Sequence, residues 1–350
     1  MANSDMSGQV QTVLGPVNPE NLGPTTTHEH LLIDFTCMFD PPKEASERFK
    51  AFAPVTLENL GWIRYNPFRN KDNLEVLDQD LAIHEILQFK AQGGGTVVDA
   101  TTFGIGRDPK ALTRISRLTG VNVVMGAGFY VDAVHPDDMD HMTDTELGDE
   151  IITQLSTGVD NTDIKAGIIG ELGCSWPLTE NERKVLAGGA RAQVSTGAAI
   201  LIHPGRNIQA PFEIIDVLAE SGADPEKIIM GHIDRTVLEE DVLLKLAERG
   251  TYLEYDLFGM ETSYYALSDI DLPSDAQRIG FIKLLIEAGF ADRIVLAHDV
   301  FAKSRLTKYG GPGIGHILEN IVPRMLEAGI SENDINKMTV QNPARILPFS

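Results

Sequence analysis

The chain has 350 residues, of which 51 are acidic and 29 are basic, and its formal net charge at pH 7 is −22. This acidity argues against nucleic acid and anionic membranes as partners, because both require a basic protein surface. Hydrophobic residues make up 43% and charged residues 23% of the sequence, which excludes wholesale disorder. The length fits one large domain or two ordinary ones.

The sequence contains no pattern typical of membrane insertion or secretion. No apolar run approaches the roughly 18 residues of a membrane helix, and residues 1–16 lack the basic start and apolar core of a signal peptide. The two cysteines, Cys37 and Cys174, form no C-x-x-C motif. We therefore expect two small buried thiols in a reducing, cytosolic compartment.

Short β-rich runs alternate with helical stretches along the chain. An initial strand is predicted near Val10 to Leu14. Eight further strands are predicted at 25–32, 96–99, 121–125, 166–170, 198–202, 227–230, 251–255 and 293–297. Helices are predicted at 74–91, 109–118, a segment ending near 155, 179–194, 211–219, 237–248, 276–288, 317–328 and 332–340. The spacing of Thr179 and Glu182 indicates a capping box at one of these helix starts.

This alternation predicts parallel strands joined by right-handed crossovers. Eight such units in about 350 residues predict an α/β fold, the (β/α)₈ TIM barrel, with residues 1–350 forming a single domain. The rival fold is an open doubly wound sheet, which usually has a Gly-rich dinucleotide turn after its first strand. In this chain the first barrel strand ends in His-Glu-His, which argues against the open sheet. A long insertion, roughly residues 34–73, follows the first strand, and we expect it to cover something.

Six side chains that can bind metals follow five of the predicted strands, at the end where such barrels build their active sites. They are His28 and His30 in THEH, Glu171 in GIIGELG, His203 in LIHPGR, His232 in IMGHIDR and Asp299 in VLAHD. His28 and His30 share one face of their strand, because side chains alternate with a period of two. The other histidines are expected to be structural, with some reserve for His316 after the last strand.

Four imidazoles and two carboxylates exceed the needs of one catalytic zinc ion, so we expect two divalent metal ions that share a carboxylate. Nitrogen and oxygen ligands admit zinc, which is the first expectation, and also manganese, cobalt or iron. Two such ions lower the pKa of water and polarise a carbonyl or phosphoryl oxygen. Asp299 and Glu171 are the catalytic candidates, with Asp299 placed to accept a proton.

The motifs THEH, IHPGR, GHIDR and VLAHD, spread over nearly the whole chain, resemble those of the amidohydrolase superfamily and its phosphotriesterase family. The resemblance implies that His28, His30 and Asp299 bind a more buried metal ion, that His203 and His232 bind a more exposed one, and that Glu171 bridges them. Many members of the family use a carbamylated lysine as the bridge, whereas here Lys165 lies six residues before Glu171.

Glu171, together with AGFYVDAVHP, GELGCSWPLTENERKVL, LEYDLFGME and KYGGPG, resembles the phosphotriesterase-related proteins of animals. That resemblance implies hydrolysis of the amide of N-acetyltaurine and related N-acyl taurines by a metal-bridging hydroxide, giving taurine and acetate or a fatty acid. Two alternatives stay open. One is a lactonase or phosphotriesterase that uses the same metal site, and the other is an inactive binding protein.

The sulfonate of such a small anionic substrate requires cationic or amide donors. The candidates for substrate binding are Arg206, Arg235, Tyr130, Tyr255 and Arg305, which follow predicted strands, and Lys308 is a further cation. Each arginine could equally pair with one of the many acidic residues. Asp234 could belong to a proton path or hold Arg235, and Trp62 and Trp176 could form a wall or pack in the core. A homo-oligomer also stays open.

Overall fold

The computed structural model describes residues 6–350. Residues 1–5 lie outside the described residues, and they are the start of the segment that was predicted to lack signal-peptide features. The first element is a hairpin in which β1 (Val10–Thr12) pairs antiparallel with β2 (Gly15–Val17). The sequence predicted only one strand here, because Gly15 and Pro16 interrupt the apolar pattern. No helix within residues 6–350 combines the length and the apolar character needed to span a bilayer.

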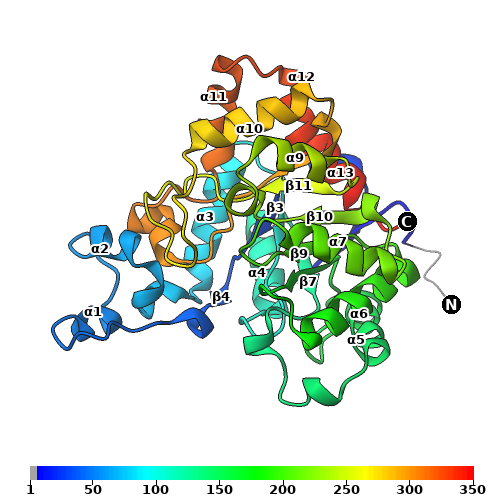
Figure 1. Ribbon diagram of the computed structural model, residues 1–350, viewed down its shortest axis with the longest axis horizontal. Coiled ribbons are helices and arrows are strands. Elements are labelled where there is room, and N and C mark those ends of the chain that lie inside the picture. The colour runs from blue at the N-terminus through cyan, green and yellow to red at the C-terminus, as the bar shows by residue number, and fades with distance from the viewer. Residues whose placement is uncertain (1–5) are drawn as a thin grey trace.

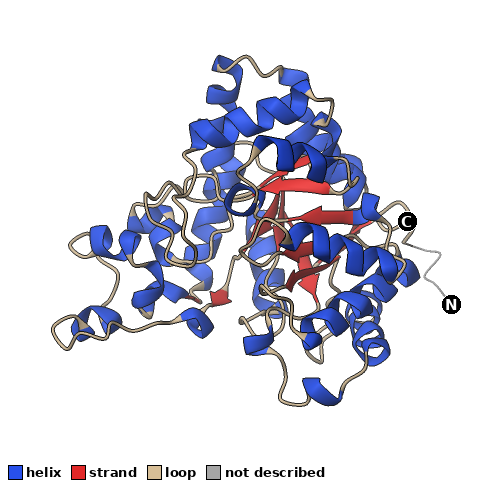
Figure 2. Ribbon diagram, in the orientation of Figure 1, coloured by secondary structure: helices blue, strands red, loops and turns tan. Residues whose placement is uncertain are grey.

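Eight parallel strands form one sheet in the order β12-β11-β10-β9-β8-β7-β6-β3. Their bounds are β3 (Thr25–Glu29), β6 (Thr96–Asp99), β7 (Asn122–Ala127), β8 (Ile168–Gly173), β9 (Ile200–His203), β10 (Ile228–Met230), β11 (Tyr252–Tyr255) and β12 (Ile294–Leu296). The amide of Asp299 donates to the carbonyl of His28 at 3.1 Å, which joins the two outer strands. The predicted (β/α)₈ barrel is therefore confirmed, and Figure 2 shows its strands surrounded by helices.

The helices follow the strands and cover the outside of the barrel (Figure 1). They are α3 (Gln79–Ala91), α4 (Pro109–Thr119), α5 (Asp144–Ser156), α6 (Glu180–Thr196), α7 (Ala210–Glu220), α8 (Ile233–Thr236), α9 (Glu240–Ala247), α10 (Asp275–Glu287), α11 (Val322–Glu327), α12 (Glu332–Asn336) and α13 (Asn342–Ile346). The predicted capping box at α6 is confirmed, because Thr179 and Glu182 each bond the other's backbone amide.

Several predicted helices differ from the observed ones, and the shifted start of the first has an identifiable reason. The helix predicted from Leu74 begins at Gln79, because Asp78 caps it and β5 (Glu75–Val76) pairs with β4 (Ile33–Asp34). A separate short helix, α8, precedes α9, and π-helical turns at Ile317–Ile321 and Lys337–Gln341 interrupt the last two predicted helices.

The insertion after the first barrel strand contains β4, α1 (Arg48–Phe52) and α2 (Leu60–Tyr65), and it extends away from the chain termini (Figure 1). Its residues Phe35 and Phe68 pack with Phe301, which follows β12, and the three rings line a pocket at the mouth of the barrel. The expectation that the insertion covers something is therefore confirmed.

Alternation along the strands separates the interior of the barrel from the layer beneath the helices. On β9, Ile200 and Ile202 belong to the large cluster that packs against the helices, whereas Leu201 belongs to a smaller inner cluster. The same period places His203 on the inner side with Leu201. The barrel is thus filled by apolar side chains at one end and by polar ones at the other. Cys174 is a buried thiol as predicted, whereas Cys37 is exposed.

Candidate metal and active site

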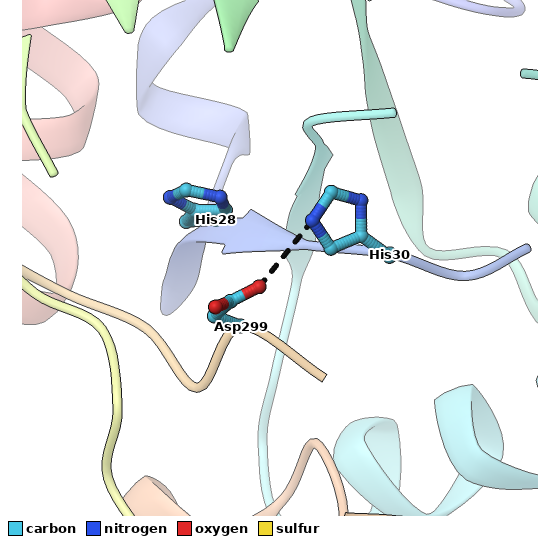
Figure 3. A group of neighbouring side chains, drawn as sticks. All are labelled: His28, His30 and Asp299. Carbon is cyan, nitrogen blue, oxygen red and sulfur yellow. Dashed lines mark ion pairs between the residues drawn. The ribbon is translucent and has the colours of Figure 1, made fainter. Parts of the chain in front are cut away.

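Two histidines of the first barrel strand meet the aspartate that follows the last one. Figure 3 shows the imidazoles of His28 and His30 beside the carboxylate of Asp299. The Nε2 atom of His30 lies 3.3 Å from Oδ1 of Asp299, and all three residues are buried. Candidate ligand atoms of this trio lie within 4.8 Å of one another, which is a spacing that one ion can bridge.

Glu171 lies at the centre of the cluster. Its carboxylate oxygens are 3.4 Å from Nε2 of His28, 3.3 Å from Nε2 of His30 and 2.9 Å from Nδ1 of His203. Glu171 belongs to β8 itself, whereas the sequence predicted that the strand ends one residue earlier. Lys165 lies at the opposite end of the barrel, in a groove lined by Gln11 and Leu14.

The two remaining histidines approach each other closely. Nδ1 of His203 and Nε2 of His232 are 2.8 Å apart, and Nε2 of His232 lies 3.7 Å from Oε2 of Glu171. The structure therefore brings together all six residues that the sequence singled out as metal-competent.

The donor set fits divalent metal ions. Nε2 of His28 is fully buried and has no hydrogen-bond partner among the described residues, although it faces Glu171. An orphaned buried nitrogen is costly unless something binds it. Imidazole nitrogens and carboxylate oxygens are ligands for zinc and its neighbours in the first transition row.

A second layer of polar groups orients the histidines. Asp256 accepts hydrogen bonds from the backbone amide of His232 at 2.7 Å and from its Nδ1 at 2.8 Å. Glu254 lies 3.0 Å from Nδ1 of His28, and Thr101 lies 2.9 Å from Nδ1 of His30. Such partners fix the tautomer and the direction of a metal-binding imidazole.

His232 and Asp299 have left-handed backbone conformations, with φ of +53° and +49°. This region is sparsely populated by residues other than glycine and costs on the order of 1–3 kcal/mol per residue. Such strain persists where the surrounding structure imposes it, and here it turns two side chains towards the cluster.

The electrostatics of the cluster favour cations. Burial lowers the pKa of His30, but hydrogen bonding to Asp299 and Glu171 outweighs it and raises that pKa to about 9. Burial raises the pKa of Glu171, yet nearby His28 and His203 hold it well below its usual range. Without metal ions, these carboxylates thus retain protons on His28 and His30, whereas burial and the charge of His232 lower the pKa of His203 well below its usual range. Divalent ions would displace those protons.

The cluster opens into a pocket with aromatic and cationic walls. Five of the six residues, all but His28, line it, and the rest of its lining consists of Phe35, Phe68, Tyr130, Arg206, Arg235, Leu257, Met260, Tyr265 and Phe301. Three of the predicted substrate-binding residues, Tyr130, Arg206 and Arg235, are therefore at the pocket. The Tyr130 hydroxyl lies 3.3 Å from Nδ1 of His203.

The other two predicted substrate-binding residues lie elsewhere. Tyr255 is fully buried and points outward to the helices, because Glu254 and Asp256 on either side of it point inward. Arg305 is buried beside the pocket, where its Nη2 donates to the carbonyls of Phe258 and His298. Neither side chain lines the pocket, so the structure does not support direct substrate contact by them.

The structure also places the residues whose roles the sequence left undecided. Asp234 pairs with Arg278 at 2.7 Å rather than with Arg235, and His316 lies 2.9 Å from Asp275, outside the pocket. Trp176 is 40% exposed, so it does not pack in the core. Trp62 packs against the small cluster of Val55, Leu60 and Ile63 in the insertion.

A (β/α)₈ barrel with four histidines, a glutamate and an aspartate gathered at its mouth defines a class of protein that can hold metal ions in an enclosed pocket. The Phosphotriesterase family matches residues 8–347, and the chain belongs to this family.

The relatives of the chain match it along its whole length. The N-acetyltaurine hydrolases of Xenopus tropicalis and Homo sapiens are each 50% identical over 348 residues, which cover 99% of both chains. A resiniferatoxin-binding protein from Rhodobacter sphaeroides superposes with a TM-score of 0.95 at 39% identity, covering 97% of this chain and 95% of the other.

The sequence missed Glu254, Tyr265 and the aromatic wall of Phe35, Phe68 and Phe301. Glu254 could have been found from the alternation in LEYD, which places it on the same face as Asp256. Of the other four residues, Phe68 lies in a single 3-10 turn (Pro67–Arg69), and Tyr265, Phe35 and Phe301 lie outside helices and strands. They belong to irregular segments without a period, so no signal in the sequence placed them at the pocket.

Proposed function

We propose that this protein hydrolyses the amide bond of N-acetyltaurine and related N-acyl taurines, releasing taurine and acetate or a fatty acid. The observation that carries the hydrolytic chemistry is the convergence of His28, His30, His203 and His232 on Glu171 and Asp299. Full-length relatives named N-acetyltaurine hydrolase support the choice of substrate.

We also propose that the site binds two divalent ions, with zinc as the first candidate. His28, His30 and Asp299 would hold one ion and His203 and His232 the other, with Glu171 between them. When bound, such ions lower the pKa of water and polarise the acyl oxygen.

Asp299 is the proposed proton carrier of the reaction. The water oxygen bonds to the acyl carbon, and the Asp299 carboxylate accepts a proton from that water. The carbon–nitrogen bond then breaks as Asp299 passes this proton to the leaving amine nitrogen. The carboxylic acid product loses its own proton to the amine at neutral pH.

Tyr130 and the aromatic wall complete the proposed machinery. Burial raises the pKa of Tyr130 well above its usual range, so its hydroxyl keeps a proton that it can donate to the oxygen gaining negative charge. Phe35, Phe68 and Phe301 exclude water from the pocket and give the acyl group an apolar surface.

The cellular setting is part of the proposal. We propose that the chain acts as one domain in the cytosol on a small anionic substrate, with nucleic acid and membranes excluded as partners. The acidity of the chain and its lack of a disulfide among the described residues support this setting. The number of subunits stays open.

A hydrolysis panel tests the proposal. Metal-loaded protein should release taurine from N-acetyltaurine, and His203→Ala should lower kcat/KM by at least about 10²-fold because a group that stabilises the reacting charge is lost. His84→Ala is the matched control, since His84 is exposed on α3. Consumption of a lactone or a phosphotriester without any release of taurine would support the alternative hydrolase instead.

A further inference from the structure

We propose that Arg206 and Arg235 form a single anion-binding subsite, positioned by Tyr265, that selects substrates with a sulfonate or carboxylate on the amine side of the amide. The inference rests on the proposed function and deepens it, since it assigns the residues that recognise the charged part of the substrate.

Arg206 is held in place at one end only. Its Nε donates to the Tyr265 hydroxyl at 2.9 Å, and the guanidinium lies 5.7 Å from the centre of the Tyr265 ring. The terminal nitrogens of Arg206 have no hydrogen-bond partner within residues 6–350, although the side chain lines the pocket. Two charged donors therefore remain for a ligand.

Arg235 lines the same pocket and is fixed beside His203. It is 4% exposed, and its Nη2 donates to the carbonyl of Pro204 at 3.1 Å and lies 3.2 Å from Nε2 of His203. These contacts are to uncharged groups, so they orient the guanidinium without neutralising its charge.

Neither arginine has a carboxylate partner, which is unusual for a buried guanidinium group such as that of Arg235, and Arg206 is only partly exposed. Among the described residues, no salt bridge involves Arg206 or Arg235, whereas arginines such as Arg107 and Arg278 form them. Two like charges held together in a buried pocket are relieved by an anion between them.

The charge of the whole pocket leads to the same conclusion. Glu171 and Asp299 are the two carboxylates of its lining, and Arg206 and Arg235 are the two guanidinium groups. These charges balance within the lining, and the two carboxylates beneath it, Glu254 and Asp256, would offset only part of the charge that two divalent ions add. A substrate with one negative charge compensates part of that excess, whereas a neutral substrate does not.

The loop that carries Tyr265 is attached to the insertion. Tyr264, the preceding residue, stacks on Tyr65 of α2 with ring centres 5.6 Å apart and an interplanar angle of 18°. Tyr265 is 6% exposed and turns inward to Arg206, whereas Tyr264 is 48% exposed. Tyr265 is therefore a positioning residue, which acts on the substrate through Arg206.

The experiment compares two amides that differ in one group. N-acetyltaurine carries a sulfonate where N-acetylethanolamine, with the same two-carbon spacing, carries a neutral hydroxyl. Arg206→Gln should lower kcat/KM for N-acetyltaurine by about 10- to 100-fold, mainly through KM, because charge-assisted hydrogen bonds are lost. The same variant should leave N-acetylethanolamine hydrolysis within about 2-fold, and Arg206→Lys should restore part of the loss.

Tyr265→Phe should raise KM for N-acetyltaurine by about 2- to 10-fold with little change in kcat, because Arg206 loses one hydrogen bond that fixes it. Tyr264→Phe retains the stacked ring and is the matched tyrosine control. Arg191→Gln, which alters an exposed pair with Asp149, is the matched arginine control. Both controls should behave as the unaltered protein does on both amides.

A binding measurement separates the inference from the reaction. Propane-1-sulfonate should bind the metal-loaded protein in calorimetry, and Arg206→Gln should weaken that binding about 10-fold or more. If taurine is never released but this binding depends on Arg206, the proposed function fails and the anion subsite stands. Two results would overturn the subsite while leaving the hydrolase proposal intact. One is an equal loss of kcat/KM on both amides in Arg206→Gln, and the other is sulfonate binding that this variant does not weaken.

Discussion

Arg278 on the one hand and Arg206 and Arg235 on the other lie near the mouth of the barrel, and they differ in their partners. Arg278 is fully buried, with Nε 2.7 Å from Asp234 and Nη1 2.9 Å from Asp275. Arg206 and Arg235 lie at the pocket with no carboxylate partner among the described residues. The charge of Arg278 is matched within the chain and holds the fold together, whereas the charges of Arg206 and Arg235 are unmatched at the pocket and are available to a ligand.

Removal of the metal ions should have the largest effect. It should change anion binding by Arg206 and Arg235 and leave the ion pairs of Arg278 unchanged. A strong chelator should abolish hydrolysis, and thermal unfolding should shift down because ligand binding stabilises the folded state by about 4 kcal/mol at 1,000 times Kd. Sulfonate binding should weaken at the same time, since the excess positive charge is gone. Restoring zinc should reverse all three changes, and hydrolysis that survives chelation would contradict the metal site.

Replacement of single arginines should separate the two groups by stability. Arg278→Met should lower the free energy of unfolding by about 3–5 kcal/mol, because Asp234 becomes a buried charge without an ion-pair partner and Asp275 keeps only His316. Arg235→Met should cost about 1 kcal/mol or less, because only hydrogen bonds to uncharged groups are lost. Urea unfolding of the metal-free proteins provides the measurement, and equal losses would mean that Arg235 is structural as well.

The smallest effect concerns pH. Burial raises the pKa of Asp275, but its hydrogen bonds with His316 and Gly259 and the charge of Arg278 outweigh it and lower that pKa below 3.8. A lowered pKa contributes stability that is present above pH 3.8 and is lost as the pH falls through the folded-state value. The stability difference between the unaltered protein and Asp275→Asn should therefore shrink below pH 3.8. A difference that is constant with pH would show that the Asp275 charge contributes nothing.

Local patterns in the sequence predicted much of the fold and of the cluster. Apolar runs bounded by glycine and polar residues placed the eight barrel strands within a few residues, and THEH, IHPGR, GHIDR and VLAHD named the side chains that gather at the mouth. These signals work because they depend on near neighbours and on the general rule that parallel strands end at one edge.

Contacts between distant segments were not predictable. The attachment of Arg206 to Tyr265 joins residues 59 positions apart, through a loop without a period. The pairing of Asp234 with Arg278 required knowledge of how α10 packs, so Asp234 could not be assigned to it from the sequence. The prediction for Tyr255 differs from the structure for another reason. It did not apply the alternation along β11, which turns the side chain of Tyr255 outward to the helices.

The bond between the Asp299 amide and the His28 carbonyl lies where the first and last strands of the barrel meet. His28 and Asp299 are 271 residues apart in the chain, so these donors come together only after the ring of strands has closed. An ion held by His28, His30 and Asp299 would bridge that seam. Metal affinity in this protein would then report on closure of the barrel, and the last step of folding would be coupled to metal supply.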